Sequence, residues 1–157
     1  MGQEIERKFL VEDDTWRDGA ISTHFRQGFL STVPERTVRV RLAGERGTLT
    51  VKGKTIGATR LEFEYEIPTV DAQTLLDSLC ERPLIEKTRF VRQEGAHTWE
   101  IDVFEADNQG LIVAEIELEA EDEAFERPSW IGKEVTDDPR YFNANLIKHP
   151  YRTWTEA

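Results

Sequence analysis

The chain has 157 residues, enough for one domain that buries about two thirds of its unfolded surface, so disulfides are not needed for stability. Its formal net charge is −11, from 31 acidic and 20 basic residues, which argues against a surface that neutralises nucleic-acid phosphates. Cys80 is the single cysteine, and no apolar run approaches the ~18 residues of a membrane span. Glu4, Glu6, Arg7 and Lys8 exclude the apolar core of a signal peptide. We therefore expect a cytoplasmic protein without a nucleic-acid or membrane partner.

Eight segments alternate between polar and apolar residues with the period of two that is typical of strands. They cover residues 3–11, 24–32, 36–43, 47–54, 59–67, 84–93, 97–105 and 111–120. Turn residues separate many of them, as at 44–47, 95–96 and 106–110, where Gly, Asn and Asp tolerate a left-handed backbone. Helices are predicted over 70–81, over 122–126 before Pro128, and from about 139 to 147. The sequence shows no linker or repeat, so we expect a single domain over residues 1–157.

Charged residues recur on one face of each predicted strand, where residues i and i+2 lie ~6–7 Å apart. They often carry like charge, in the pairs Glu4/Glu6, Arg39/Arg41, Glu62/Glu64, Lys87/Arg89, Glu100/Asp102 and Glu115/Glu117. A single strand of this kind is more simply explained as the solvated face of a sheet. Like charges repeated strand by strand instead indicate an enclosed space, in which acidic pairs hold cations and basic pairs hold polyanions.

Eight strands of this pattern can close into a barrel wide enough for a small ligand. We therefore predict a mainly β, α+β fold: a closed eight-stranded antiparallel β-barrel with a polar lumen and a few flanking helices. Its apolar exterior needs cover from the helices at 70–81 and 121–147, or from a second subunit, so a homodimer is one option. Trp130, Phe142 and Trp154 are candidates for that packing.

The opening Glu4-Ile5-Glu6-Arg7-Lys8 resembles the E-x-E-x-K signature of the CYTH superfamily, also called triphosphate tunnel metalloenzymes. Further blocks resemble the family in the same order, at residues 27–30, 39–41, 50–54, 60–64, 87–89, 99–102, 114–117 and 134–146. The resemblance implies an eight-stranded tunnel that hydrolyses a small triphosphate with a divalent metal. The short chain shows no extra base-binding module, so inorganic tripolyphosphate, cleaved to diphosphate and phosphate, is the leading substrate.

The resemblance also implies a division of roles among the charged residues. The basic side chains would bind the triphosphate: Lys8, Arg39, Arg41, Lys52, Lys54, Lys87 and Arg89. The acidic side chains would ligate Mg²⁺ or Mn²⁺: Glu4, Glu6, Glu100, Asp102, Glu115 and Glu117. Lys8, Glu62 and Glu64 are the catalytic candidates, and the two glutamates would orient the attacking water or hold a second metal.

One block departs from the family pattern. Members that act on inorganic tripolyphosphate often have Tyr where this chain has Phe29, and Phe29 offers no hydroxyl to hydrogen-bond Lys8. Three other functions stay open: a thiamine triphosphatase, an adenylate cyclase-like enzyme, and a non-catalytic polyphosphate- or nucleotide-binding module. A salt-bridge network without any ligand is a further alternative, although unbalanced charge in a closed lumen is costly.

Overall fold

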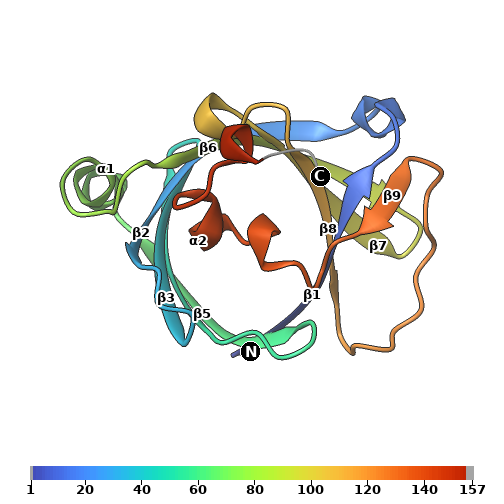
Figure 1. The fold of residues 1–157 in the computed structure, drawn as a ribbon, viewed down its shortest axis with the longest axis horizontal. Coiled ribbons are helices and arrows are strands. Elements are labelled where there is room, and N and C mark those ends of the chain that lie inside the picture. Colours follow the sequence, from blue (N-terminus) through green and yellow to red (C-terminus); the bar gives the residue numbers. More distant parts are fainter. Residues whose placement is uncertain (1, 155–157) are drawn as a thin grey trace.

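The computed structural model describes residues 2–154, whose strands form a closed antiparallel barrel (Figure 1). The sheet order is β5-β4-β3-β2-β6-β7-β8-β1-β9, and a further pairing of β5 with β1 closes the ring. The strands are β1 (Gln3–Val11), β2 (Ile21–Ser31), β3 (Arg36–Ala43), β4 (Arg46–Gly53), β5 (Thr59–Ile67), β6 (Ile85–Glu94), β7 (His97–Phe104), β8 (Ile112–Leu118) and β9 (Ile131–Glu134). The predicted mainly β, closed eight-stranded antiparallel barrel is confirmed, with β9 as an extra strand beside β1.

The helices of the described part are few and short. They are α1 (Thr69–Ser78), the one-turn α2 (Asn143–Leu146), and 3-10 helices at Thr15–Arg17, Ala106–Asn108, Pro139–Tyr141 and Tyr151–Thr153. Among residues 2–154, no helix has the length and apolar character that crossing a membrane would need.

The strand register decides which side chains face the lumen, because directly paired residues point to the same side of a sheet. Lys8 of β1 pairs with Glu115 of β8, and Arg39 of β3 pairs with Phe29 of β2 and Thr50 of β4. The charged face predicted for each strand is therefore the inner face of the barrel. The apolar face points outward, as in an inverted barrel.

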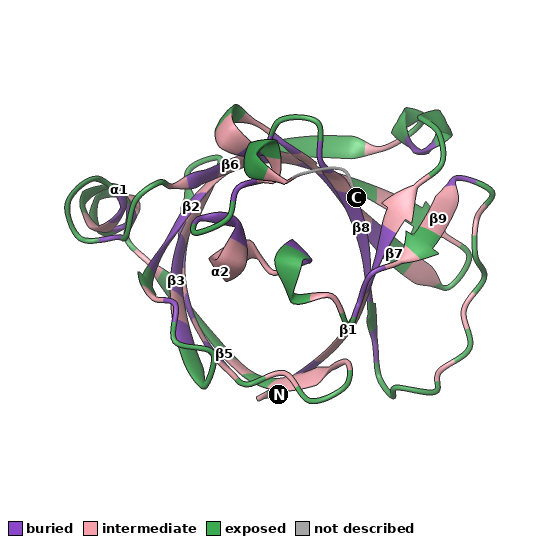
Figure 2. Ribbon diagram, viewed as in Figure 1, coloured by how far each residue is buried: buried purple, intermediate pink, exposed green. Residues whose placement is uncertain are grey.

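Apolar side chains on the outer wall are covered from two sides. Leu76 of α1 packs with Val40 of β3 in one buried cluster. Across the barrel, Trp16 and Trp130 pack against Trp99 of β7 in a larger aromatic cluster, which confirms the predicted packing role of Trp130. Figure 2 shows buried residues along the strands of the ring and exposed residues on the outer side of α1 and on the loops.

The C-terminal segment closes one end of the lumen, and here the prediction that residues 121–147 cover the exterior is wrong in part. At that end the inward-facing residues include Ile85 and Phe104, which form a buried cluster with Leu146 of α2. In Figure 1, α2 and the preceding 3-10 helix lie inside the ring of strands. Phe142 accordingly lines the lumen instead of the outer wall, because the apolar end of the lumen needs cover. Trp154 packs at the margin of the same cluster.

Three element predictions need correction. Residues 122–126 form no helix: the Glu123 carboxylate accepts a hydrogen bond from the Glu119 N–H and contacts the His97 ring, which favours a loop. The helix expected over 139–147 is interrupted by the extended backbone of Phe142, so a 3-10 turn precedes α2. The sequence analysis missed β9, whose four residues are too few for a clear alternation. The helix expected over 70–81 is confirmed as α1, which begins and ends slightly earlier.

We expect Leu146→Ala to destabilise the protein by about 2–5 kcal/mol, because Leu146 is fully buried and its truncation leaves a cavity at the closed end of the barrel. Leu79→Ala is the matched control: Leu79 is 65% exposed, so its truncation is expected to cost less than about 0.5 kcal/mol. Urea unfolding of both variants measures the difference. Equal losses would mean that the C-terminal segment is not part of the cooperative core.

Candidate functional site

The lumen encloses a cavity of about 610 Å³. Almost every side chain that the sequence analysis assigned to the site lines it: Glu4, Glu6, Lys8, Arg39, Arg41, Lys52, Lys54, Glu62, Glu64, Lys87, Arg89, Glu100, Glu115 and Glu117. Arg60 of β5 lines the same cavity, as does Asn143 of α2. Cations and carboxylates from all sides of the barrel therefore share one enclosed space.

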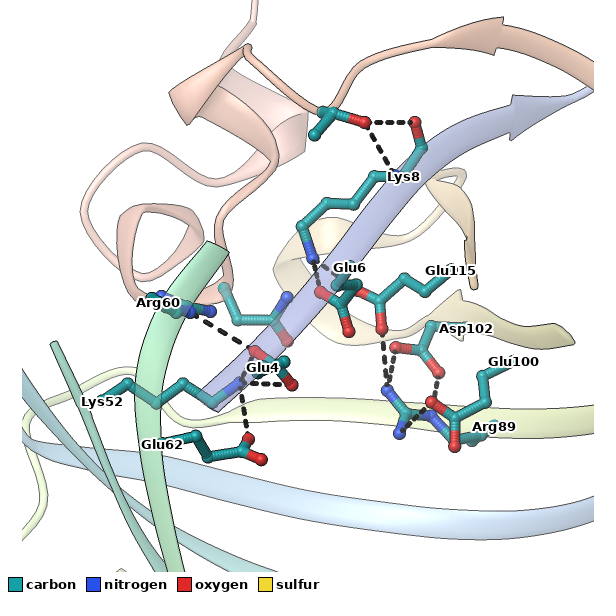
Figure 3. A network of polar contacts seen from close by, with 12 residues as sticks. Glu4, Glu6, Lys8, Lys52, Arg60, Glu62, Arg89, Glu100, Asp102 and Glu115 are labelled. Carbon is teal, nitrogen blue, oxygen red and sulfur yellow. Dashed lines mark hydrogen bonds and ion pairs between the residues drawn. The ribbon is translucent and has the colours of Figure 1, made fainter. Parts of the chain in front are cut away.

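One group of ion pairs surrounds Glu4, as Figure 3 shows. Lys52 Nζ lies 3.0 Å from Glu4 and 3.3 Å from Glu62, and Arg60 Nε lies 3.4 Å from Glu4. Burial by itself raises the pKa of Glu4, but the charges of Lys52 and Arg60 outweigh it and lower the pKa to about 2. Glu4 is therefore ionised at neutral pH despite its burial.

A second group of ion pairs connects β1, β6 and β8. Lys8 Nζ lies 2.7 Å from Glu6 and 2.6 Å from Glu115, and Arg89 lies 3.3 Å from the other oxygen of Glu115 (Figure 3). Burial opposes the charge of Lys8, but Glu115 and Glu6 outweigh it and raise the pKa of Lys8 above its ordinary value. Lys8 is therefore a permanent cation whose position is fixed by two carboxylates.

Asp102, predicted as a metal ligand, shares the inner face of the barrel with Arg89, its partner across the strands, and is only 1% exposed because Lys87 and Arg89 cover it. Arg89 donates from Nε to Asp102 Oδ1 at 2.7 Å and from a terminal nitrogen to Oδ2 at 2.9 Å, and Lys87 Nζ donates to Oδ2 at 2.7 Å. Both carboxylate oxygens are thus occupied by cations. This geometry suits a counterion that orients Lys87 and Arg89 better than it suits a ligand facing the cavity.

Two arginines of β3 lack comparable neutralisation. Arg39 donates to Thr50 Oγ1 at 3.2 Å and lies 3.6 Å from Glu64, but its buried Nε has no acceptor among residues 2–154. Burial, together with the charge of Arg89, lowers the pKa of Arg39; burial, Arg39 and Arg89 do the same for Arg41. An anion in the lumen would relieve this repulsion and supply the missing acceptor.

The acidic side of the cavity has the oxygen donors that a divalent cation prefers. Within the described part, no three Asp, Glu, His or Cys side chains converge closely enough to form a ready metal cage. Burial, followed by the charges of Glu4, Glu62 and Glu6, nevertheless raises the pKa of Glu117 to about 6. Negative charge is therefore concentrated beside Glu117, and the donor set fits a divalent cation.

Three residues that the sequence analysis did not select support the cations. The Phe25 ring centre lies 4.5 Å from the Arg41 guanidinium and 4.9 Å from that of Arg89. Gln27 accepts a hydrogen bond from Arg41 Nε at 2.9 Å and donates one to Asn143. The alternation of side chains along β2 places Phe25 and Gln27 on the lumen face. Their positions in that alternation could therefore have identified them from the sequence. Asn143 lies outside the strands, and strand alternation contains no signal for it.

We expect stability to rise with pH between about 7 and the ordinary lysine value of 10.5. Burial, against the attraction of Asp102, lowers the pKa of Lys87 to about 7. Over this range the unfolded chain binds a proton that the native protein does not, so rising pH favours the native state. Urea unfolding at about pH 7 and about pH 9 is expected to show a larger gain for the wild type than for Lys87→Met. Equal gains would refute the lowered pKa.

The comparisons with known proteins agree with this geometry. The CYTH domain family model matches residues 2–151. An inorganic triphosphatase from Acetivibrio thermocellus is 49% identical over 156 residues, which are 99% of this chain and 100% of that protein. An inorganic triphosphatase from Nitrosomonas europaea is 36% identical over 148 residues, covering 91% of this chain and 95% of that protein.

A solved structure shares the barrel. The crystal structure of an inorganic triphosphatase superposes with a TM-score of 0.65 at 33% identity, over 91% of this chain and 96% of that one. The sequence and the fold both match this family over nearly the whole length of the chain. This chain therefore belongs to the CYTH domain family.

Proposed function

We propose that this protein is a metal-dependent inorganic triphosphatase, which hydrolyses tripolyphosphate to diphosphate and phosphate. The observation that carries the proposal is the enclosed group of cations, in which Arg39 Nε is buried without an acceptor among residues 2–154. Buried cations that lower one another's pKa are stabilised by a polyanion, and a linear triphosphate can reach several of them at once. Relatives at 49% and 36% identity named inorganic triphosphatases support the same activity.

The cations are proposed to hold the phosphoryl groups from different sides of the lumen. Arg39, Arg41 and Arg89 offer forked donors that match phosphate oxygens, and Lys52 and Lys87 offer compact charges. Lys54 lines the cavity beyond Lys52 on the same stretch of chain and would extend the basic surface. Phosphoryl transfer requires positioning and charge neutralisation more than covalent chemistry, so this arrangement can supply much of the rate acceleration.

Lys8 is proposed to bind phosphate as a fixed cation and not as half of a lysine–tyrosine pair. Phe29 faces the lumen beside Arg39 and packs in the apolar cluster of the closed end. It has no hydroxyl, and Lys8 Nζ is held by Glu6 and Glu115. Proton transfer through a phenol at this position is therefore absent from the proposed mechanism.

We propose that Glu4, Glu6, Glu115 and Glu117 would hold Mg²⁺ or Mn²⁺, with Glu100 at the edge of the group. When bound, the divalent cation would neutralise charge that develops on the phosphate oxygens. Glu62 is the best-placed residue to orient the attacking water, because it lines the cavity beside Glu4, and burial raises its pKa. Glu64 is a weaker candidate, because it accepts a hydrogen bond from Thr50 and pairs with Arg39.

The remaining expectations stay proposals. They are a single domain over residues 1–157, a cytoplasmic location and a homodimer.

Turnover assays with tripolyphosphate, ATP and thiamine triphosphate, each with Mg²⁺ or Mn²⁺, separate the inorganic triphosphatase from a thiamine triphosphatase or a cyclase-like enzyme. Tripolyphosphate binding without any turnover would favour a non-catalytic binding module.

We expect tripolyphosphate to stabilise the protein against heat even when all metal is chelated. Binding to the native state alone contributes about 2.7 kcal/mol at one hundred times the dissociation constant, a shift of several degrees for a chain of this size. Arg39→Ala is expected to lose most of that shift, because it removes a buried cation that faces the lumen.

Arg46→Ala is the matched control for Arg39→Ala. Arg46 lies at the start of β4 with its side chain 65% exposed, and it is expected to keep the wild-type shift. Sodium chloride at matched ionic strength is expected to do less than tripolyphosphate, since monovalent ions cannot contact several guanidinium groups together. Equal shifts from both salts would argue against a shared polyanion site.

Glu117→Gln is expected to raise the Mg²⁺ concentration required for half-maximal turnover by about tenfold, equivalent to about 1.4 kcal/mol of lost metal affinity. The fold is expected to stay intact near pH 8, because the substitution removes a charge whose pKa is already raised by neighbouring carboxylates. Glu119→Gln, two residues along and exposed, is the control and is expected to leave the Mg²⁺ requirement unchanged. An unchanged Mg²⁺ requirement in Glu117→Gln would remove Glu117 from the metal site.

A further inference from the structure

Asn143 connects the C-terminal segment to the cations of the barrel. Its Oδ1 accepts hydrogen bonds from Gln27 Nε2 at 2.7 Å and from Lys87 Nζ at 2.9 Å. Gln27 Oε1 in turn accepts from Arg41 Nε at 2.9 Å. The two amides of Asn143 and Gln27 thus form a bridge between cations on β6 and β3, and we refer to these two side chains as the amide bridge.

Arg41 fixes the orientation of the amide bridge. A guanidinium can only donate hydrogen bonds, so Arg41 must face the amide oxygen of Gln27. Gln27 therefore directs its oxygen to Arg41 and its nitrogen to Asn143, and Asn143 directs its oxygen to both donors. A reversed Asn143 would place its N–H groups against those of Gln27, so the assignment follows from the hydrogen bond that Arg41 donates to Gln27.

This orientation leaves the amide nitrogen of Asn143 directed away from the bridge. Both lone pairs of Oδ1 are occupied, whereas Nδ2 donates to no acceptor within residues 2–154. Asn143 lines the cavity that contains the cations, whereas Gln27, on the inner face of β2, is fully buried. Two N–H donors are thus available at the closed end of the lumen, beside Lys87.

We propose that Asn143 is a substrate-binding residue whose Nδ2 donates to a phosphoryl oxygen at the closed end of the lumen, while its Oδ1 positions Lys87. This inference rests on the proposed triphosphate function and adds a contact from outside the strands. An amide is an appropriate donor here, because it binds an anionic oxygen without adding to the repulsion among the buried cations. Phosphate held by both Lys87 and Asn143 would be anchored to the barrel and to the segment that closes it.

The experiment measures tripolyphosphate affinity by calorimetric titration, with metal chelated, for the wild type and three variants. Asn143→Leu removes the donor and the acceptor at similar volume, and we expect binding roughly ten- to a hundredfold weaker, as for a lost hydrogen bond to a charged group. Gln27→Met breaks the bridge but leaves Nδ2 of Asn143 in place, so it is expected to lose clearly less. Asn145→Leu is the matched control on the same helix, because Asn145 lines the same cavity but its side-chain Nδ2 already donates to the Pro139 carbonyl.

Circular dichroism and thermal melting confirm that each variant is folded, and Asn143→Ala replaces Asn143→Leu if the larger side chain unfolds the protein. Turnover with Mg²⁺ is measured in parallel, and we expect the Asn143 variant to raise KM more than it lowers kcat. If the wild type binds tripolyphosphate but does not hydrolyse it, the triphosphatase proposal is wrong. The role of Asn143 can still be tested, because the tripolyphosphate affinities of the variants are compared without any hydrolysis.

Three results would overturn the role of Asn143. They are wild-type affinity in Asn143→Leu, an equal loss in Asn145→Leu, and a loss in Gln27→Met as large as that in Asn143→Leu. The last result would mean that the amide bridge acts by positioning Arg41 and Asn143, and not through a direct contact from Asn143 Nδ2. A wild-type protein that does not bind tripolyphosphate would overturn this inference and the proposed function together.

Discussion

The cations that face one small lumen repel one another and have lost much of their hydration, and the surrounding structure compensates for both costs. Asp102 accepts hydrogen bonds from Lys87 and Arg89, Glu4 pairs with Lys52 and Glu115 pairs with Lys8, and the Phe25 ring lies against two guanidinium groups. Replacing a buried ion pair with apolar residues is often neutral or stabilising. A network this extensive is therefore better explained by ligand binding than by stability, and Arg39 Nε, still without an acceptor in the described part, supports that reading.

The polar lumen also determines how the outside of the barrel is built. Because each strand directs its charged face inward, its apolar face must find cover elsewhere. Residues of α1 cover β3 and β4, while Trp16 and Trp130 cover the wall around Trp99. Apolar side chains at the closed end of the lumen recruit the C-terminal segment into the barrel, which brings Asn143 to Lys87. The inward direction of the charged strand faces thus determines both the packing on the outer wall and the position of Asn143 beside Lys87.

Much of this was readable from the sequence, because strand alternation reports which face a residue occupies. The like-charged pairs on successive strands predicted the lumen and nearly all of its lining, but not the individual ion pairs within it, such as that of Lys8 with Glu115. Alternation reports the face of a strand but not how a side chain is covered, so it contains no signal that Lys87 and Arg89 occupy both carboxylate oxygens of Asp102. It is also silent outside strands, so the place of Phe142 and Asn143 inside the barrel was missed. Local propensity favoured a helix over 122–126, which aromatic packing and the contacts of Glu123 overrode.

The inward position of the C-terminal segment has a consequence for synthesis of the chain. Closure of the barrel joins β1 to β5 and to β8, and residues 139–147 lie within the ring that those strands form. During translation the amino-terminal strands emerge first, so the basic side chains of β3 and β4 exist well before the residue that bridges Lys87 and Gln27. An incomplete chain would lack both the closed end and the amide bridge. The contact that reaches Lys87 from outside the strands is therefore added only after residues 139–147 have been synthesised.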